Sequence, residues 1–214
     1  MVRDGKPIFF SLLALGVVTL ILGFWFQPMV IVAAVILFLA AFVAYFFRDP
    51  ERVPPSGDDL ILSPADGKIV VIEPLGDREV LVSIFLSIFD VHVNRAPIAG
   101  TVTAVDYREG RFMIATDKRA SVENEQNVVT MENGMVRVVF KQIAGLIARR
   151  IVFWKRVGNE LARGERVGLI KFGSRVDVIM PKNVELHVQV GDHVVGGLSV
   201  LGRVGEDASS RRSR

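Results

Sequence analysis

The chain has 214 residues and a formal net charge of +3, and 50% of its residues are hydrophobic. It contains no cysteine, which excludes disulfides, cysteine-ligated zinc and a cysteine nucleophile. The small positive charge is compatible with an anionic lipid surface, whereas no basic stripe with interleaved aromatic residues points to nucleic acid. The histidines His92, His187 and His193 lack the spacing of a metal-binding motif, so no metal is expected.

Two apolar runs, at residues 7–26 and 29–47, hold most of the hydrophobic excess. Each would be about 28 Å long as a helix, close to the roughly 30 Å of a bilayer's hydrocarbon core. Pro28 separates the runs, so we expect a membrane hairpin of two helices over residues 1–47. A cleaved signal peptide is the alternative, but a second apolar run follows the first directly.

Basic residues flank the hairpin on both sides, whereas the turn between the two runs carries no charge. The flanking residues are Arg3 and Lys6 before it, and Arg48 and Arg52 after it. By the positive-inside rule, both ends of the hairpin lie in the cytoplasm. The sequence therefore predicts a protein on the cytoplasmic face of the cell membrane, although hydropathy does not distinguish a full span from a shallow re-entrant hairpin.

Residues 48–60 are rich in proline and other turn formers and form the expected linker. Short β-type runs separated by turn signals follow at 68–72, 79–86, 101–105, 135–140, 169–172, 176–180 and 185–190. This spacing predicts an all-β sandwich or barrel over residues 61–204 with few short helices, one of them at 141–155. The basic segment 205–214 is expected to be disordered.

Residues 65–70 and 190–197 are both similar to the turn-then-strand pieces of lipoyl-like barrel-sandwich domains. Residues 115–120 are similar to the hairpin of a lipoyl carrier, in which Lys118 would be the attachment site. The fold class expected is thus mostly β, a lipoyl-like barrel-sandwich body after a hydrophobic hairpin.

Four motifs carry the candidate chemistry. They are Ser-Pro-Ala-Asp-Gly at 63–67, Phe-Asp-Val-His-Val-Asn-Arg-Ala-Pro at 89–97, Asn-Glu-Gln-Asn at 124–127 and Phe-Gly-Ser-Arg-Val-Asp-Val at 172–178. In this order, behind a hydrophobic hairpin, the motifs resemble those of the phosphatidylserine decarboxylase proenzymes, in particular the short form. The resemblance extends over residues 48–202.

The resemblance implies an enzyme that cuts itself between Gly173 and Ser174. A large chain 1–173 and a small chain 174–214 would then form a heterodimer, whose further dimerisation is left open. Ser174 would become a covalent pyruvoyl cofactor that forms a Schiff base with phosphatidylserine and releases CO₂ and phosphatidylethanolamine. Asp66 and a histidine would assist the cut, and His92 is the candidate proton donor.

One position departs from the family pattern. Longer members carry a second histidine in the motif where this chain has Arg95, so that role passes to His92, Asp66 or another group.

Further side chains are candidates for supporting roles. Lys171, Arg175 and Lys182 could hold the lipid phosphate or form a solvated edge. Asn124 and Asn127 could hold a loop over the site through backbone hydrogen bonds.

Two other functions remain open from the sequence. One is the decarboxylation of a related serine phospholipid such as archaetidylserine, which shares the headgroup. The other is a non-enzymatic membrane adaptor, or a carrier modified at Lys118.

Overall fold

The computed structural model describes residues 1–113, 119–145, 150–171 and 174–205. The chain divides into two compact units, Met1–Pro50 and Glu51–Arg214.

The first unit is a pair of packed helices. A 3₁₀ turn (η1, Arg3–Gly5) leads into α1 (Lys6–Leu22), and α2 (Pro28–Phe46) follows. The helices approach closely at Gly16, where an added Cβ would lie 2.7 Å from a side-chain carbon of Leu37. The main-chain N–H of Val2 donates to the carbonyl of Phe47 (2.9 Å) and joins the two ends of the pair. The expected helical hairpin is thus confirmed.

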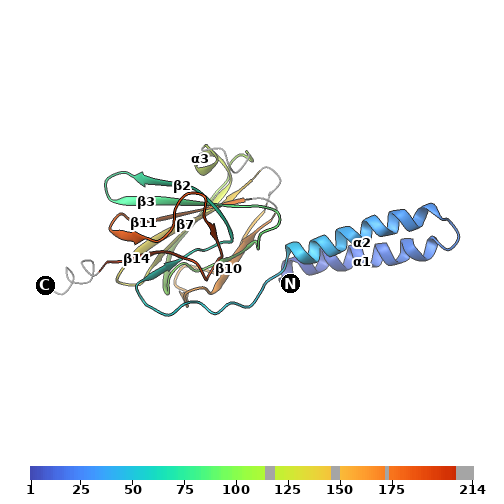
Figure 1. Ribbon diagram of the computed structural model, residues 1–214, viewed down its shortest axis with the longest axis horizontal. Coiled ribbons are helices and arrows are strands. Elements are labelled where there is room, and N and C mark those ends of the chain that lie inside the picture. The colour runs from blue at the N-terminus through green and yellow to red at the C-terminus, as the bar shows by residue number, and fades with distance from the viewer. Residues whose placement is uncertain (114–118, 146–149, 172–173, 206–214) are drawn as a thin grey trace. The chain divides into compact units, whose positions relative to one another are not determined.

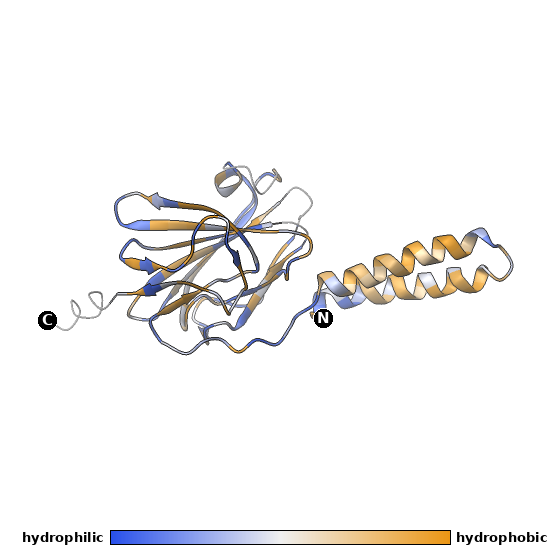
Figure 2. Ribbon diagram, viewed as in Figure 1, coloured by the Kyte–Doolittle hydropathy of each residue, from blue (hydrophilic) through white to orange (hydrophobic). Residues whose placement is uncertain are grey.

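The residues of this helix pair are mostly hydrophobic (Figure 2). Phe10 and Phe38 are 58% and 70% exposed, and the two candidate spans have mean hydropathies of 2.0 and 2.9. A helix of 19 residues is about 28 Å long, enough to cross a hydrocarbon core. Because exposed apolar area of this size is unfavourable in water, the hairpin supports association with a membrane.

The second unit is built from β-strands (Figure 1). Their bounds are β1 Leu60–Leu62, β2 Gly67–Leu75, β3 Glu79–Leu86, β4 Val93–Arg95, β5 Gly100–Arg108, β6 Gln126–Glu132, β7 Arg137–Ala144, β8 Ile151–Phe153, β9 Glu160–Leu161, β10 Arg166–Ile170, β11 Ser174–Pro181, β12 Val184–Leu186, β13 His193–Val194 and β14 Val200–Val204. The short helix α3 spans Ala120–Glu123.

Within the described residues the strands form one large sheet and two small ones. The large sheet has the order β13-β2-β3-β11-β7-β6-β5-β9, and the small sheets have the orders β4-β10-β8 and β1-β14-β12. Every strand pair is antiparallel. One hydrophobic cluster joins the three sheets through side chains such as Ile84 on β3, Val176 on β11, Ile170 on β10 and Leu201 on β14.

The mostly β prediction is confirmed, with one local exception. The expected helix at 141–155 is wrong for the described residues, because β7 continues to Ala144 and β8 occupies Ile151–Phe153. The two similar segments at 65–70 and 190–197 lie next to each other, since His193 on β13 pairs with Lys68 on β2.

Candidate active site

Ser174 is the first residue of β11, which lies between β3 and β7 in the large sheet. Its partners are Leu86 on β3 and Ala144 on β7, so the strand is paired on both sides. Its side chain is fully buried, and Oγ makes no hydrogen bond to any described residue. A buried hydroxyl without a partner costs about 1–3 kcal/mol, so this position calls for a functional explanation. Gly173, the other half of the expected cleavage bond, lies outside the described residues, as does Lys118.

His92 is buried just before β4 and is fixed through backbone contacts. Its Nδ1 lies 3.0 Å from the carbonyl oxygen of Asp90. Because a carbonyl only accepts, Nδ1 carries the hydrogen, and in the neutral ring the basic lone pair is on Nε2. The main-chain N–H of Ile170, at the end of β10, donates to the carbonyl of His92 (3.4 Å). His92 is therefore positioned beside the segment that leads into Ser174.

Three buried amide side chains connect β6, β7 and β4. Asn127 Nδ2 donates to Gln142 Oε1, and Gln142 Nε2 donates to Asn94 Oδ1, each at 2.9 Å. The three side chains are at most 2% exposed. We call Asn127, Gln142 and Asn94 the amide chain.

The amide chain places the second motif over the face of the sheet that bears Ser174. Gln142 and Ala144 are two residues apart on β7 and share a face, and Ala144 pairs with Ser174. Asn94 is on β4, and His92 lies two residues before it, where the N–H of Ile170 on β10 still donates to the His92 carbonyl. We infer that His92 and Ser174 face the same interior region.

Asn124 holds the segment that precedes residue 114. Its Nδ2 donates to the carbonyls of Met113 (2.9 Å) and Ala144 (2.8 Å), and its Oδ1 accepts from the N–H of Met113 (3.0 Å). The expected backbone contacts of Asn124 are thus present, next to the strand partner of Ser174. Asn127 instead bonds to a side chain, that of Gln142.

A buried ion pair lies on the opposite face of β11. Arg175 Nε donates to Asp177 Oδ1 (2.6 Å), and Arg175 Nη2 donates to Ser83 on β3 (2.6 Å). Asp177 Oδ2 accepts from Ser121 of α3 (2.8 Å). Because the guanidinium is paired inside the protein, Arg175 is a poor candidate for the lipid phosphate.

The other two phosphate candidates lie at opposite ends of β11. Lys182 follows the last residue of β11, and at about 3.4 Å per residue it is roughly 27 Å from Ser174, too far to contact a headgroup bound there. Lys171 is half-buried just after β10 and remains a candidate.

Asp66 takes part in a bidentate ion pair. Its Oδ1 and Oδ2 lie 2.6 and 2.8 Å from Nη1 and Nη2 of Arg52, and Oδ1 also accepts from the N–H of Gly196 (2.8 Å). Asp66 precedes β2, which is two strand spacings, roughly 10 Å, from β11. In this arrangement the carboxylate orients its surroundings, and its part in the cut stays a prediction.

Arg95, at the position of the second family histidine, points away from Asn94, because the two are adjacent on β4. Its Nη1 donates to the carbonyl of Gly164 (3.0 Å). The guanidinium therefore does not occupy the side of β4 to which Asn94 points.

Gln142 and Arg52 were missed from the sequence. Gln142 did leave a signal, because it stands at an inward position of the alternating run Val138, Phe140, Gln142, Ala144, where a lone amide is unusual. Arg52 gave no such signal in the sequence, because a basic residue at this position is also explained as the flank of a membrane hairpin.

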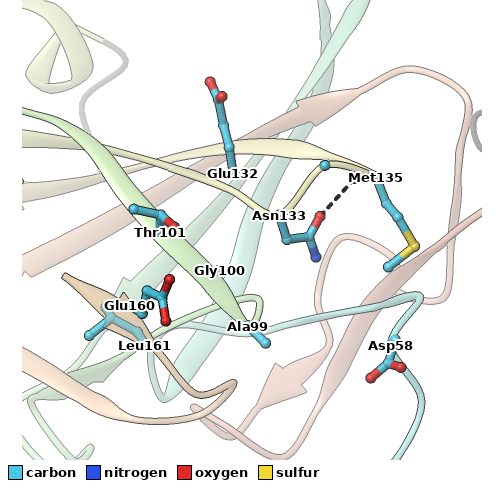
Figure 3. Close-up of a pocket in the computed structure, with 10 residues that line it drawn as sticks. Asp58, Ala99, Gly100, Thr101, Glu132, Asn133, Met135, Glu160 and Leu161 are labelled. Atoms are coloured by element: carbon cyan, nitrogen blue, oxygen red, sulfur yellow. Dashed lines mark hydrogen bonds between the residues drawn. The ribbon is translucent and has the colours of Figure 1, made fainter. Parts of the chain in front are cut away.

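A cavity of about 550 Å³ (Figure 3) lies at the ends of the strands of the large sheet that are far from Ser174. Its acidic side chains are Asp58, Glu132 and Glu160. Glu132 ends β6, whereas the motif residue Gln126 begins it, so this cavity is a strand's length from the motifs. Its negative charge also disfavours a phospholipid headgroup.

The fold and this site define a β-sheet protein with a buried serine at a predicted self-cleavage bond, next to a positioned histidine. The family model for phosphatidylserine decarboxylase matches residues 39–202. The chain therefore belongs to the phosphatidylserine decarboxylase family, and it is an enzyme of that family.

Curated relatives agree with this assignment. A phosphatidylserine decarboxylase proenzyme of Solibacter usitatus is 53% identical over 168 residues, covering 78% of this chain and 81% of the relative. Proenzymes of the same name from Symbiobacterium thermophilum and Magnetococcus marinus are 46% and 44% identical over 209 residues, covering 94% of both chains. This family membership excludes the adaptor and carrier alternatives.

Proposed function

We propose that the chain cuts itself between Gly173 and Ser174 and that Ser174 becomes the pyruvoyl group used to decarboxylate phosphatidylserine. The observation that carries this proposal is the fully buried Ser174 Oγ, which has no hydrogen-bond partner among the described residues. The name proenzyme, which the relatives bear, supports a processing step.

In the cut, Ser174 Oγ attacks the carbonyl carbon of Gly173, and the acyl group moves from nitrogen to oxygen to give an ester. His92 Nε2, which carries the basic lone pair, accepts the hydroxyl proton. Removal of the Ser174 Cα proton then expels the ester carboxylate of Gly173. The resulting dehydroalanine hydrolyses to a pyruvoyl group and ammonia.

The pyruvoyl group supplies a carbonyl that binds the substrate amine as a Schiff base and accepts the electron pair left by CO₂. The chain's own residues orient the headgroup and move protons. His92 returns a proton to the carbon that has lost CO₂. The amide chain keeps the backbone around His92 in register with β7.

The strand pairing predicts that the two chains stay together after the cut. In the small chain, β11 is paired over its length with β3, and over six residue pairs with β7, both from the large chain. β13 and β14 of the small chain also pair with β2 and β1 of the large chain. The product is then a heterodimer whose core is shared between its chains.

We assign phosphatidylserine as the substrate from the family, and the apolar hairpin keeps the enzyme beside it. The basic flanks of the hairpin support a cytoplasmic location of the β unit. Archaetidylserine is the second candidate, because the serine phosphate headgroup is the same.

Intact mass spectrometry tests the cut. We expect two chains, with the small chain about 17 Da lighter than one beginning with serine, as the change to pyruvoyl requires. Ser174→Ala should give one chain of 23.6 kDa without decarboxylase activity, whereas the exposed linker variant Ser56→Ala should be cut normally. An uncut, fully active Ser174→Ala protein would refute the proposal.

His92→Gln tests the two proposed roles of this histidine, as proton acceptor in the cut and as proton donor in the decarboxylation. We expect slow cutting and, in any cut fraction, slow decarboxylation. Matched assays with diacyl and diether serine lipids then distinguish phosphatidylserine from archaetidylserine.

A further inference from the structure

A cleft of about 450 Å³ in the β unit is lined by more basic than acidic side chains. Of the described residues that line it, five are basic, namely Arg52, Arg95, Lys155, Arg163 and Arg166, and two are acidic, Glu51 and Glu165. Its size is within the range of small-ligand sites. An excess of positive charge in a concave surface attracts anions.

The charge of Arg163 is not offset by an acidic side chain among the described residues. Its Nη2 donates to the carbonyl of Pro55 (2.8 Å), and its Nη1 donates to the carbonyl of Gly57. Both partners are neutral, and no acidic side chain among the described residues pairs with it. Its Nε is buried and also lacks a hydrogen-bond partner within the described part of the chain. A buried donor of this kind is satisfied when an oxyanion binds.

One of the two acidic residues of the cleft, Glu51, can give way to a ligand. Glu51, which pairs with Arg166 (2.7 Å), has a side chain that is 89% exposed. Glu165 pairs with Lys155 (2.5 Å) and is 35% exposed. The exposed Glu51 pair contributes little to stability, so an incoming anion can replace it, whereas the pair of Glu165 with Lys155 is part-buried.

The cleft is separate from the proposed reaction centre. Arg95 contributes to the cleft, whereas its neighbour Asn94 points to the opposite side of β4 and joins the amide chain. A headgroup bound in the cleft is therefore on the other side of this strand from Ser174. The cleft and the proposed reaction centre share only an indirect link: Arg52, which lines the cleft, forms an ion pair with Asp66.

The cleft also begins close to the apolar hairpin along the chain. Glu51 and Arg52 follow Phe46, the last residue of α2, by five and six residues, which is a contour length of about 20 Å at most. This short tether makes the phosphate of a membrane lipid the favoured ligand.

We propose that this cleft binds the phosphate oxyanion of an anionic phospholipid, at a second site that takes no part in the reaction. Arg163 and Lys155 supply the charge, and the Nε–H of Arg163 supplies a hydrogen-bond donor. Inorganic phosphate has the same oxyanion chemistry and is the other source of ligand.

Calorimetric titration of the full-length Ser174→Ala protein in non-ionic detergent tests the site independently of processing and activity. The probes are dihexanoyl phosphatidylglycerol, dihexanoyl phosphatidylcholine and inorganic phosphate. We expect binding of the phosphatidylglycerol, no binding of the zwitterionic lipid, and weakening by salt. If phosphate binds as tightly as phosphatidylglycerol, the site is one for free phosphate; if it does not, the lipid headgroup is the ligand.

Charge-removing variants locate the site. At about 1 kcal/mol for each cation, Arg163→Gln and Lys155→Gln should each weaken binding about fivefold, and the double variant about 25-fold. Arg137→Gln, which removes an exposed cation near the acidic cavity, should leave the affinity unchanged. Should Arg163→Gln fail to fold, Lys155→Gln alone carries the test. The absence of any anion binding, or equal affinities for Lys155→Gln and Arg137→Gln, would overturn the proposal.

Discussion

Replacing Gln142 by leucine tests the amide chain. Gln142→Leu keeps the size of the side chain approximately but removes both hydrogen bonds, to Asn127 Nδ2 and Asn94 Oδ1. These two groups are buried, so they would lose their partners without gaining water.

The expected loss of stability follows from these two unsatisfied groups. Each buried donor or acceptor left unpaired costs about 1–3 kcal/mol, so we expect about 2–6 kcal/mol in all. Leucine recovers part of this loss through apolar burial, at about 25 cal/mol per Å², which places the net effect in the lower half of that range. Because Asn94 is on the strand that follows His92, we also expect slower cutting at Ser174.

The stability assay is denaturant unfolding of the β unit in the uncut Ser174→Ala background, followed by near-ultraviolet circular dichroism. The rate assay is the half-time of cutting with Ser174 present. Gln189→Leu is the matched control, because that side chain is exposed. A free energy of unfolding for Gln142→Leu within about 0.5 kcal/mol of the control, with an unchanged cutting rate, would refute the reasoning.

Two further predictions concern the sheet. At Gly67 (φ +147°) an added Cβ would lie 2.2 Å from the carbonyl oxygen of Phe85. Gly67→Ala should therefore destabilise the β unit by at least about 2 kcal/mol in denaturant unfolding. The control Gly76→Ala should cost less, because Gly76 also has a positive φ but open space around it. Burial and a hydrogen bond to Glu125 raise the pKa of Tyr107 to about 12. Because the folded protein favours the neutral phenol, Tyr107 contributes its full share to folding stability below pH 10. This contribution is lost as the pH rises toward 12. Glu125→Gln should lower this pKa in a phenolate absorbance titration, and an unchanged titration would contradict the assignment.

The sequence was sufficient for features encoded by local pattern. Long uncharged apolar runs predicted the helix pair, and a β-type run bounded by turn signals predicted β3 at residues 79–86, which the structure confirms as Glu79–Leu86. Strands of two or three residues, such as β9 and β13, are too short to show alternation. They are defined by pairing with strands distant in sequence, β9 with β5 and β13 with β2.

The candidate site was predictable as a set of motifs but not as an arrangement. The partners of Ser174 come from segments 88 and 30 residues away in sequence, Leu86 and Ala144. No local signal specifies such pairing. The same holds for the pairing of Asp66 with Arg52, which no local pattern indicates; the part of this carboxylate in the cut stays a prediction.

Buried polar groups gather around the beginning of β11, on both of its faces. The amide chain lies on the face of Ser174, and the Arg175–Asp177 pair lies on the other, although apolar side chains fill the rest of the strand's surroundings. Buried polar groups seldom add net stability over apolar ones, but they allow only the arrangement in which every partner is in reach. We infer that they fix the orientation of the strand end at Ser174. A reaction in which a main-chain bond must meet a neighbouring hydroxyl requires such fixed geometry.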